Sequence, residues 1–316
     1  MENRKILLID QAHPLLEEKL TAANFECLPM YQASLEEIYD ILPECFGVVM
    51  RSRFKADKKF IDRGINLKFI AREGVGLEHI EVDYAEIKGI QVLYSPEGSR
   101  DTVAEHALGM LLMLLNKLSV ADQEVRSGEW NRESNRGIEI KGKTIGIIGY
   151  GNMGSALAQR LKGFEANVIA YDKFKFGYED DNVKEVKLET IFEQSDIVSL
   201  HIPYSTDNHY FVNADFLSRF QKNIFLLNTA RGMVLNTADL IEALKSGKVR
   251  GAALDVLEYE ETSVNFLDFR QLPSPFQYLI HAVNVVLSPH IAGWSVESKL
   301  GHARVLAEKI IQRFSA

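Results

Sequence analysis

The chain contains 316 residues, which is enough for about two domains of ordinary size. It carries 36 Lys and Arg against 44 Asp and Glu, a net charge of -8, so a basic nucleic-acid-binding surface is not expected. With 46% hydrophobic and 25% charged residues, the composition is that of an ordinary folded protein and excludes a disordered or collagen-like chain.

Two cysteines, Cys27 and Cys45, both lie beside apolar residues. Two cysteines are too few for a disulfide framework, so we expect a reducing, cytoplasmic location. They are also too few for a multi-cysteine metal site, and no histidine pair has zinc spacing beside a carboxylate, so we expect no metal ion. The segment MENRKILLID lacks the features of a signal peptide, and the longest apolar run, residues 107–115, is about half of a membrane span. We therefore expect no membrane contact.

Short apolar runs rich in β-branched residues recur along the chain, with helical patterns between most of them. Such runs are typical of parallel strands covered by helices on both faces, so the predicted fold class is α/β with doubly wound parallel sheets. The runs form one set before about residue 98 and another after about residue 142. They are residues 5–10, 46–51, 67–72, 90–94, 144–149, 168–172, 197–202, 223–229, 251–256 and 283–288.

Two helical segments are distinctive. Residues 101–118 are apolar on almost every side, which predicts a helix buried between domains or against a partner subunit. Residues 295–314 repeat apolar side chains near helical spacing, so we expect one amphipathic helix there.

The sequence TIGIIGYGNMG at residues 144–154 places a G-x-G-x-x-G pattern between a predicted strand and a predicted helix. In such a unit Gly149 permits the tight turn, Gly151 lets the backbone approach a pyrophosphate, and Gly154 lets the helix pack closely on the strand. Free amides at the start of the helix favour an anion. The pattern therefore predicts a dinucleotide site that includes these glycines with Asn152 and Met153.

An acidic residue, Asp172, lies at the end of the next predicted strand, 18 residues after Gly154. A carboxylate at this place accepts hydrogen bonds from the adenosine ribose and repels a 2′-phosphate, so the predicted cofactor is NAD rather than NADP. The neighbouring Lys173 and Lys175 would offset part of that repulsion.

Polar residues follow the last three predicted strands and include Arg231, Glu260 and His290. Ligands of open α/β sheets bind outside the carboxyl ends of strands, so we expect these residues to meet at the reactive end of the cofactor. Oxidation of an alcohol needs a base that accepts the hydroxyl proton near neutral pH, for which a histidine is suited. A carboxylate would orient that histidine, and an arginine would bind a substrate carboxylate. Taken singly, each residue also fits a structural role.

Seven segments occur in an order that is more specific than any one of them: REGVGLEHI (72–80), VAEHALGMLL (103–112), KGKTIGIIGYGNMG (141–154), LHIP (200–203), LLNTARG (226–232), AALDV (252–256) and SPHIAG (288–293). Together they resemble the D-isomer-specific 2-hydroxyacid dehydrogenases over nearly the whole chain. The resemblance implies a Rossmann NAD domain at residues 99–291, inserted into a flavodoxin-like substrate domain formed by residues 1–98 and 292–316. It also implies a homodimer joined through the helix around residues 103–115.

The resemblance assigns roles by position in these segments. The implied catalytic residues are Arg231, Glu260 and His290. The loop whose amides would hold the substrate carboxylate is Gly74, Val75 and Gly76. The implied cofactor contacts beyond the Gly-rich turn are Thr229, Ala230, Asp255 and Gly293.

The sequence departs from the usual family pattern at three places. Glu260-Glu261 stands where Glu-Pro is usual, so which carboxylate orients the base stays open. The segment between Glu260 and His290 is longer than usual and predicts an inserted loop at about residues 262–278. Ser99 stands where many members have Asn near the cofactor.

Cations gather after the second predicted strand in the sequence Arg51-Ser52-Arg53-Phe54-Lys55. This stretch resembles the RSxxK of phosphoglycerate dehydrogenases and predicts a phosphorylated D-2-hydroxy acid, such as 3-phospho-D-glycerate, bound by Arg51, Ser52 and Lys55. Solvated surface charge is the alternative interpretation. The HIAGW sequence resembles that of 4-phosphoerythronate dehydrogenases, which implies an alternative phosphorylated substrate. Reduction of hydroxypyruvate or glyoxylate is a further alternative. An alternative of another class is a binding protein, because the same fold also serves NAD-sensing corepressors.

Overall fold

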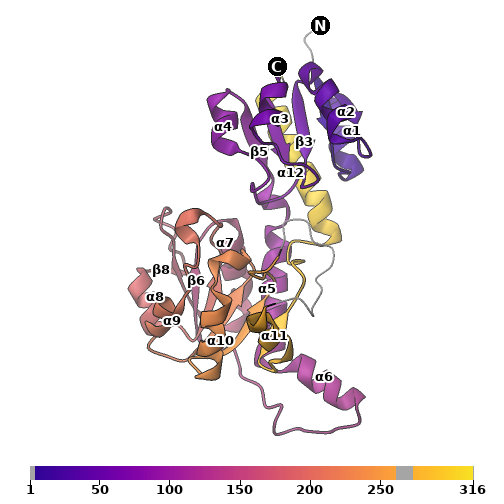
Figure 1. Ribbon diagram of the computed structural model, residues 1–316. Coiled ribbons are helices and arrows are strands. Elements are labelled where there is room, and N and C mark those ends of the chain that lie inside the picture. The colour runs from indigo at the N-terminus through magenta and orange to yellow at the C-terminus, as the bar shows by residue number, and fades with distance from the viewer. Residues whose placement is uncertain (1–3, 261–272, 316) are drawn as a thin grey trace. The chain divides into compact units, whose positions relative to one another are not determined.

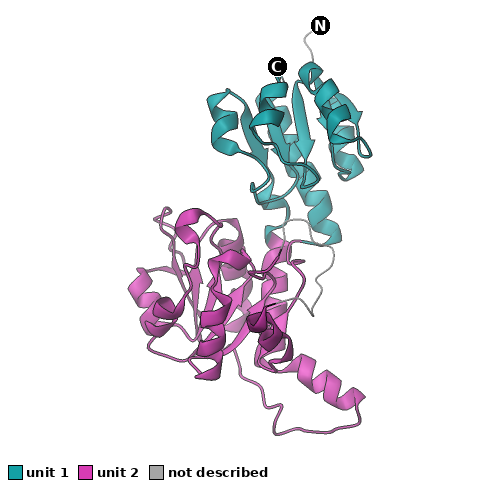
Figure 2. Cartoon of the chain, viewed as in Figure 1, with its two compact units in different colours: residues 1–100, 294–316 teal, residues 101–293 magenta. Residues whose placement is uncertain are grey.

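The computed structural model describes residues 4–260 and 273–315. The chain divides into two compact units (Figure 2). Unit 1 is formed by Met1–Arg100 with Trp294–Ala316, and unit 2 by Asp101–Gly293. Unit 1 is therefore built from two separate pieces of the chain, whereas unit 2 is one continuous piece.

Unit 1 contains a five-stranded parallel sheet with the strand order β2-β1-β3-β4-β5. This order is that of flavodoxin-like folds. The strands are β1 Lys5–Leu8, β2 Glu26–Pro29, β3 Gly47–Met50, β4 Phe69–Arg72 and β5 Gln91–Tyr94. Because all pairs are parallel, the carboxyl ends of the five strands lie along one edge of the sheet.

Helices cover both faces of this sheet (Figure 1). One face packs on α2 Leu35–Ile41, α3 Lys58–Arg63 and α4 Val82–Ile87. The other face packs on α1 Pro14–Ala22 and on α12 Val296–Phe314, whose apolar side enters the same core as β1 and β4. The amphipathic helix that ends the sequence thus completes a core begun by the first strand.

A glycine pair lets α12 approach the 3₁₀ turn Pro96–Gly98 closely. A Cβ atom on Gly98 would lie 2.4 Å from the amide nitrogen of His302, and one on Gly301 would lie 2.5 Å from the carbonyl oxygen of Gly98. Backbone therefore packs directly on backbone here, and any side chain at either glycine would force the segments apart.

Unit 2 contains a seven-stranded parallel sheet with the order β12-β11-β10-β9-β6-β7-β8, the Rossmann order extended by one strand. The strands are β6 Thr144–Ile148, β7 Asn167–Tyr171, β8 Lys184–Glu185, β9 Ile197–Leu200, β10 Ile224–Asn228, β11 Val249–Leu254 and β12 Val285–Leu287. The strand order reverses between β6 and β9, which is where nucleotides bind in such sheets.

The helices of unit 2 also lie on two faces. One core cluster joins the sheet to α5 Arg100–Leu115 and α7 Asn152–Leu161. The opposite cluster joins it to α8 Leu188–Gln194, α9 Ala214–Ser218, α10 Thr237–Lys245 and α11 Ser274–His281. α6 Leu118–Arg126 has no buried residue and extends away from the sheet (Figure 1).

The predicted fold class is confirmed, since both units are parallel α/β sheets and each predicted apolar run overlaps a strand. The runs missed β2 and β8, which are edge strands and therefore need no continuous apolar sequence. The predicted helix at 101–118 ends earlier, because Lys117 adopts a left-handed conformation and the chain bends by 60° into α6. Among the described residues, no single helix is long and apolar enough to cross a bilayer, although α5 and α6 together reach that composition.

Candidate active site

The Gly-rich turn joins β6 to α7 at the point where the strand order reverses. Gly149 has a φ of +95°, and a Cβ atom there would lie 2.5 Å from the carbonyl oxygen of His201. At Gly154 a Cβ atom would lie 2.1 Å from the carbonyl oxygen of Gly149. The first glycine thus supplies a conformation that L residues rarely adopt, and the second lets α7 pack against the turn.

Gly151 differs from its two neighbours, because a Cβ atom at this position would meet no described atom within 4 Å. The helix α7 begins at the next residue with Asn152 and Met153 in its first turn, and no described side chain caps it. Open space therefore lies before an uncapped helix start, whose amides are suited to a pyrophosphate. These observations fit a dinucleotide cofactor.

The Asp172 carboxylate is hydrogen-bonded to three backbone amides of its own unit. Oδ2 accepts from Tyr150 at 2.7 Å, and Oδ1 accepts from Phe174 at 2.8 Å and Lys175 at 2.9 Å. The Lys175 ammonium donates to the carbonyl oxygen of Tyr150 at 3.2 Å and lies over the rings of Tyr150 and Tyr178. Asp172 therefore stabilises the Gly-rich turn. Lys175 is bound to the same turn, so its charge is less available to a 2′-phosphate.

His290 and Glu260 are hydrogen-bonded, with Nδ1 of the histidine 2.6 Å from Oε2 of the glutamate. The backbone amide of Leu257 donates to the other oxygen of Glu260. The two side chains are partly exposed, at 49% for His290 and 27% for Glu260, and the bond through Nδ1 leaves Nε2 for proton exchange. The alternative carboxylate, Glu261, and residues 262–272 of the predicted inserted loop lie outside the described residues.

The backbone of His290 adopts a left-handed conformation with a φ of +55°. Asp255 fixes this segment, because its main-chain oxygen accepts the His290 amide at 2.7 Å and its carboxylate accepts the amides of Ile291 at 2.9 Å and Ala292 at 2.8 Å. Asp255 was predicted to contact the cofactor, but it is fully buried and its oxygens already have donors from the chain. In this structure it positions the segment that carries the base.

Two polar residues support Asp255 in turn. The Ser288 hydroxyl donates to the Asp255 carboxylate at 2.6 Å, and Nε2 of His106, on α5, lies 3.0 Å from the same hydroxyl. The sequence does not predict that these two residues meet, because 182 positions separate them and offer no local signal.

The segment after β10 carries Arg231, the third predicted catalytic residue. The Asn228 side chain fixes this segment, accepting from the amide of Ala230 at 3.0 Å and donating to the carbonyl of Arg231 at 3.0 Å. One guanidinium nitrogen of Arg231 donates to the carbonyl of Ala230 at 2.7 Å. The Thr229 hydroxyl is buried without a hydrogen-bond partner in the described part of the chain, which fits its predicted contact with a cofactor.

The strand order places the three predicted catalytic residues on neighbouring strand ends. Arg231 follows β10, Glu260 follows β11 and His290 follows β12, and these strands are adjacent in the sheet. Gly293, another predicted cofactor contact, is the last residue of unit 2. The described residues contain no group of three or more His, Cys, Asp or Glu side chains placed to hold a metal ion.

In unit 1, the loop Gly74, Val75 and Gly76 follows β4. Gly74 has a φ of +153°, and its amide donates to the hydroxyl of Ser95 at 3.2 Å while its carbonyl accepts the Ser95 amide at 3.0 Å. The Gly74 amide, predicted to bind a substrate carboxylate, is therefore already engaged. The amides of Val75 and Gly76 have no acceptor among the residues that the structure describes.

Ser95 also contacts His302, a histidine that the sequence analysis left without a role. Nδ1 of His302 lies 2.8 Å from the carbonyl oxygen and 3.0 Å from the hydroxyl of Ser95. Burial lowers the pKa of His302, so the ring favours its neutral form. The network fixes the Gly74 loop to α12.

The cluster Arg51–Lys55 divides into different environments. Ser52 and Lys55 are exposed, and Arg51 is half-buried beside Glu73 and over the ring of Trp294. Arg53 instead donates to the carbonyl oxygens of Met30, at 3.0 Å, and Tyr31. Arg53 therefore stabilises the backbone after β2, which leaves Arg51 and Lys55 as cations for a ligand.

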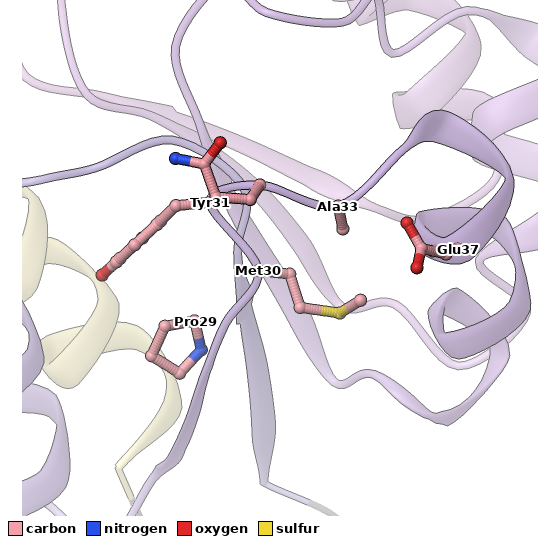
Figure 3. Close-up of a pocket in the computed structure, with 6 residues that line it drawn as sticks. Pro29, Met30, Tyr31, Ala33 and Glu37 are labelled. Atoms are coloured by element: carbon pink, nitrogen blue, oxygen red, sulfur yellow. The ribbon is translucent and has the colours of Figure 1, made fainter.

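Two of the pockets on the described surface of unit 1 adjoin the carboxyl ends of strands. The larger, about 460 Å³, follows β2 and reaches Glu37 on α2 (Figure 3). The smaller, about 180 Å³, lies at the start of α1, and Tyr31 borders both. Neither pocket is lined by a predicted site residue, and Glu37 is bonded to Ser34 in a capping box.

Comparison with known proteins decides the family. Residues 108–292 match the family model described as "D-isomer specific 2-hydroxyacid dehydrogenase, NAD binding domain". The chain belongs to the D-isomer-specific 2-hydroxyacid dehydrogenases. The residues that match this family model lie within unit 2, where the Gly-rich turn and the pair His290 and Glu260 are found.

Relatives of this dehydrogenase carry different substrate names. It is 37% identical over 280 residues to a D-3-phosphoglycerate dehydrogenase of Archaeoglobus fulgidus, which covers 88% of this chain and 51% of the relative. It is 36% identical over 277 residues to a hydroxypyruvate reductase of Thermotoga maritima, covering 88% of this chain and 87% of the relative. The dehydrogenase therefore spans about half the length of the first relative and most of the second.

Among solved structures, a D-lactate dehydrogenase with NAD+ from Lactobacillus jensenii resembles this dehydrogenase with a TM-score of 0.79. The two are 27% identical, and the match covers 98% of this chain and 95% of the other. The match therefore includes residues of both units.

Proposed function

We propose that this protein oxidises or reduces a phosphorylated D-2-hydroxy acid with NAD, with 3-phospho-D-glycerate as the first candidate. The observation that carries the dehydrogenase assignment is the hydrogen bond of 2.6 Å between His290 and Glu260 at the carboxyl edge of the NAD-binding sheet. Unit 2 is proposed as the NAD domain, predicted at residues 99–291, and unit 1 as the substrate domain.

The pair supplies the proton transfer that the reaction requires. In oxidation, Nε2 of His290 accepts the proton of the substrate hydroxyl, and in reduction the same atom returns it. Glu260 holds Nδ1, which fixes the orientation of the ring. Arg231 binds the substrate carboxylate and polarises the oxygen on C2. Bound NAD supplies the hydride acceptor or donor.

Arg51 supports a phosphorylated substrate, because its side chain is 38% exposed at the carboxyl end of β3. The neighbouring strand, β4, leads to the Gly74–Gly76 loop. Ser52 and Lys55 follow it and are exposed. The name of the Archaeoglobus fulgidus relative agrees with this proposal. A substrate of the 4-phosphoerythronate type would use the same cations.

Reduction of hydroxypyruvate or glyoxylate is the second candidate, favoured by a specific observation. The buried carboxylate of Glu73 lies 3.9 Å from Arg51 and offsets its charge, so the attraction for a phosphate dianion is weaker than for an isolated arginine. The name of the Thermotoga maritima relative agrees with this alternative.

Assembly and location are proposed from surface and composition. α6 extends from unit 2 with Leu118 and Val125 exposed, and Trp130 beyond it is exposed as well, which supports a homodimer formed through α5, α6 and the following segment. The free thiols Cys27 and Cys45 support a location in the cytoplasm.

A turnover assay tests the proposal. The purified protein is mixed with NAD and, in separate reactions, 3-phospho-D-glycerate, 4-phospho-D-erythronate, D-glycerate and D-lactate, and with NADH and hydroxypyruvate or glyoxylate. The highest kcat/KM for a phosphorylated acid is expected. A higher value for hydroxypyruvate or glyoxylate favours the second candidate, and absence of turnover with every acid, despite NAD binding, points to a binding protein of the corepressor type.

A further inference from the structure

Three charged residues lie in a row at the carboxyl edge of the unit 1 sheet. Asp10 follows β1, Arg51 follows β3 and Glu73 follows β4, and these strands are neighbours in the order β1-β3-β4. The Arg51 amide donates to the Asp10 carboxylate at 2.5 Å, and the Glu73 amide donates to the carbonyl oxygen of Met50 at 3.0 Å. The Asp10 carboxylate therefore holds the Arg51 backbone, while the Arg51 guanidinium lies near the Glu73 carboxylate.

Glu73 is the unusual member of the row. Its side chain is 3% exposed, and neither carboxylate oxygen has a hydrogen-bond donor in the described part of the chain. Arg51 approaches it with Nε at 3.9 Å, which is an ion pair without a hydrogen bond. A buried carboxylate without a close hydrogen-bond donor is costly, and the groups that lower the pKa of Glu73 are Arg51, the His13 backbone amide and Lys299.

Arg51 itself remains accessible, with 38% of its side chain exposed and its guanidinium 5.9 Å from the ring centre of Trp294. A ligand can reach Arg51, whereas Glu73 behind it is covered. Glu73 thus acts on a ligand through its charge rather than through contact, and burial keeps that charge poorly screened by salt.

We infer that Glu73 is a specificity residue, which offsets the charge of Arg51 and limits the negative charge that a ligand of Arg51 can carry. The inference rests on the proposed dehydrogenase function but holds for either substrate candidate. According to this inference, the buried carboxylate of Glu73 weakens the attraction of Arg51 for a phosphate dianion but not for an uncharged hydroxyl at the same position.

A purely positioning role for Glu73 is less well supported. The contact with Arg51 is long and lacks a hydrogen bond, while the Arg51 backbone is already held by Asp10 and its guanidinium lies over Trp294. Burial raises the pKa of Glu73, and the Arg51 guanidinium opposes this shift. A phosphate on Arg51 would remove that stabilisation, so the charges of Glu73 and of the ligand oppose each other.

The test compares two substrates that differ only in the phosphate, 3-phospho-D-glycerate and D-glycerate. Glu73→Gln should raise the ratio of kcat/KM for the phosphorylated acid over the unphosphorylated acid by about tenfold or more at low ionic strength. Glu73→Asp keeps the charge and should leave the ratio close to that of the unmodified protein. The matched control is Glu86→Gln, which removes an exposed carboxylate on α4 of the same unit and should not change the ratio.

A double variant shows whether the effect acts through Arg51. In an Arg51→Ala background, Glu73→Gln should alter the ratio much less than it does alone. An unchanged ratio in the single variant would overturn the inference, and a lower ratio would show instead that Glu73 positions Arg51 for a phosphate. Should the buried amide prevent folding, Glu73→Met removes the charge without adding an unpaired polar group.

A binding measurement separates this inference from the proposed function. Calorimetric titration with 3-phospho-D-glycerate in the presence of NADH, with which this acid does not react, should give a lower Kd for Glu73→Gln than for the unmodified protein. Absence of turnover with every D-2-hydroxy acid in the unmodified protein contradicts the proposed function alone. Equal Kd values for both proteins contradict the specificity of Glu73, whatever the assay of turnover gives.

Discussion

Asp255 holds His290 in a left-handed conformation by accepting its backbone amide at 2.7 Å. The carboxylate of Asp255 accepts the next two amides and the hydroxyl of Ser288. A histidine with positive φ costs about 1–3 kcal/mol, so it persists only where its surroundings impose it. The position of the predicted base is thus set by a buried residue that contacts its backbone and not its ring.

Asp255→Asn should lower both stability and kcat. One oxygen becomes an NH₂ group that faces backbone N–H donors, so we expect a loss of about 2–4 kcal/mol in the free energy of unfolding. The kcat should fall more than the affinity for NAD, because the Gly-rich turn is untouched. Urea denaturation and steady-state kinetics measure both. Ser288→Ala removes a single donor and should give a smaller loss, about 1 kcal/mol; an equal loss would contradict the central role of Asp255.

Glu260→Gln should lower kcat in both reaction directions. The carboxylate holds Nδ1 of His290 and so fixes the orientation of the ring, whereas an amide can also present its NH₂ group to that nitrogen. Misorientation of Nε2 should lower kcat by about tenfold or more, with a smaller change in the affinity for NAD. Steady-state kinetics in both directions measure kcat, and a fluorescence titration with NADH measures binding.

The adjacent carboxylate provides the control for that experiment. Glu261→Gln should leave kcat nearly unchanged in both directions. A loss of kcat with Glu261→Gln but not with Glu260→Gln would mean that the orienting carboxylate lies one residue later than proposed.

Two glycines of the same turn should respond differently to alanine. Gly154→Ala places a Cβ atom 2.1 Å from a carbonyl oxygen and should destabilise unit 2 by about 1–3 kcal/mol. Gly151→Ala meets no described atom within 4 Å and should leave thermal stability nearly unchanged while weakening NAD binding. Differential scanning fluorimetry and NADH fluorescence titration distinguish the two effects. Tight NADH binding by folded Gly151→Ala would argue against a pyrophosphate at this turn.

Asp172→Ser should narrow the preference for NAD over NADP. The change removes the repulsion of a 2′-phosphate, and it also removes acceptors for the amides of Tyr150 and Phe174, so NAD binding itself should weaken. The kcat/KM values for both cofactors, measured with one substrate, give the preference. Equal use of NAD and NADP by the unmodified protein would refute the role given to Asp172.

Arg51→Ala should raise the KM for a phosphorylated substrate by roughly tenfold or more, since a charged hydrogen bond contributes about 1.5–3 kcal/mol. The KM for an unphosphorylated analogue should change much less. Parallel kinetics with 3-phospho-D-glycerate and D-glycerate make the comparison. Equal losses with both acids would indicate that Arg51 is structural.

The sequence predicts best what depends on neighbouring residues. Central strands such as β6 and β10 are buried on both faces and read as continuous apolar runs, and the Gly-rich turn has its strand and helix beside it. Edge strands β2 and β8 lack that signal because one of their sides has no partner strand. Glu260 and His290 are 30 positions apart, and such a spacing defines no distance between them. Only the resemblance to the family assigns them as a pair.

Interactions over long stretches of sequence were not predicted. Ser95 and His302 are bonded across 207 residues, and no local pattern in either segment indicates it. In the sequence Glu73 looks like an ordinary loop glutamate. Its burial depends on segments that are distant in the sequence, so no local pattern predicts it. Gly74 and Asp255 are predicted to contact ligands, but the Gly74 amide and the Asp255 carboxylate also have hydrogen-bond partners within their own units. The sequence alone does not reveal these partners.

The discontinuous make-up of unit 1 has a consequence for synthesis on the ribosome. Its core cluster joins Ile6 and Leu8 of the first strand to Leu306 and Ile310 of α12. While residues 1–100 emerge, this face of the sheet is covered by α1 but lacks α12, whereas unit 2 is complete once residue 293 has been made. The part of the chain that is translated first is therefore the last to reach its native packing, and its apolar face needs protection from aggregation in the meantime.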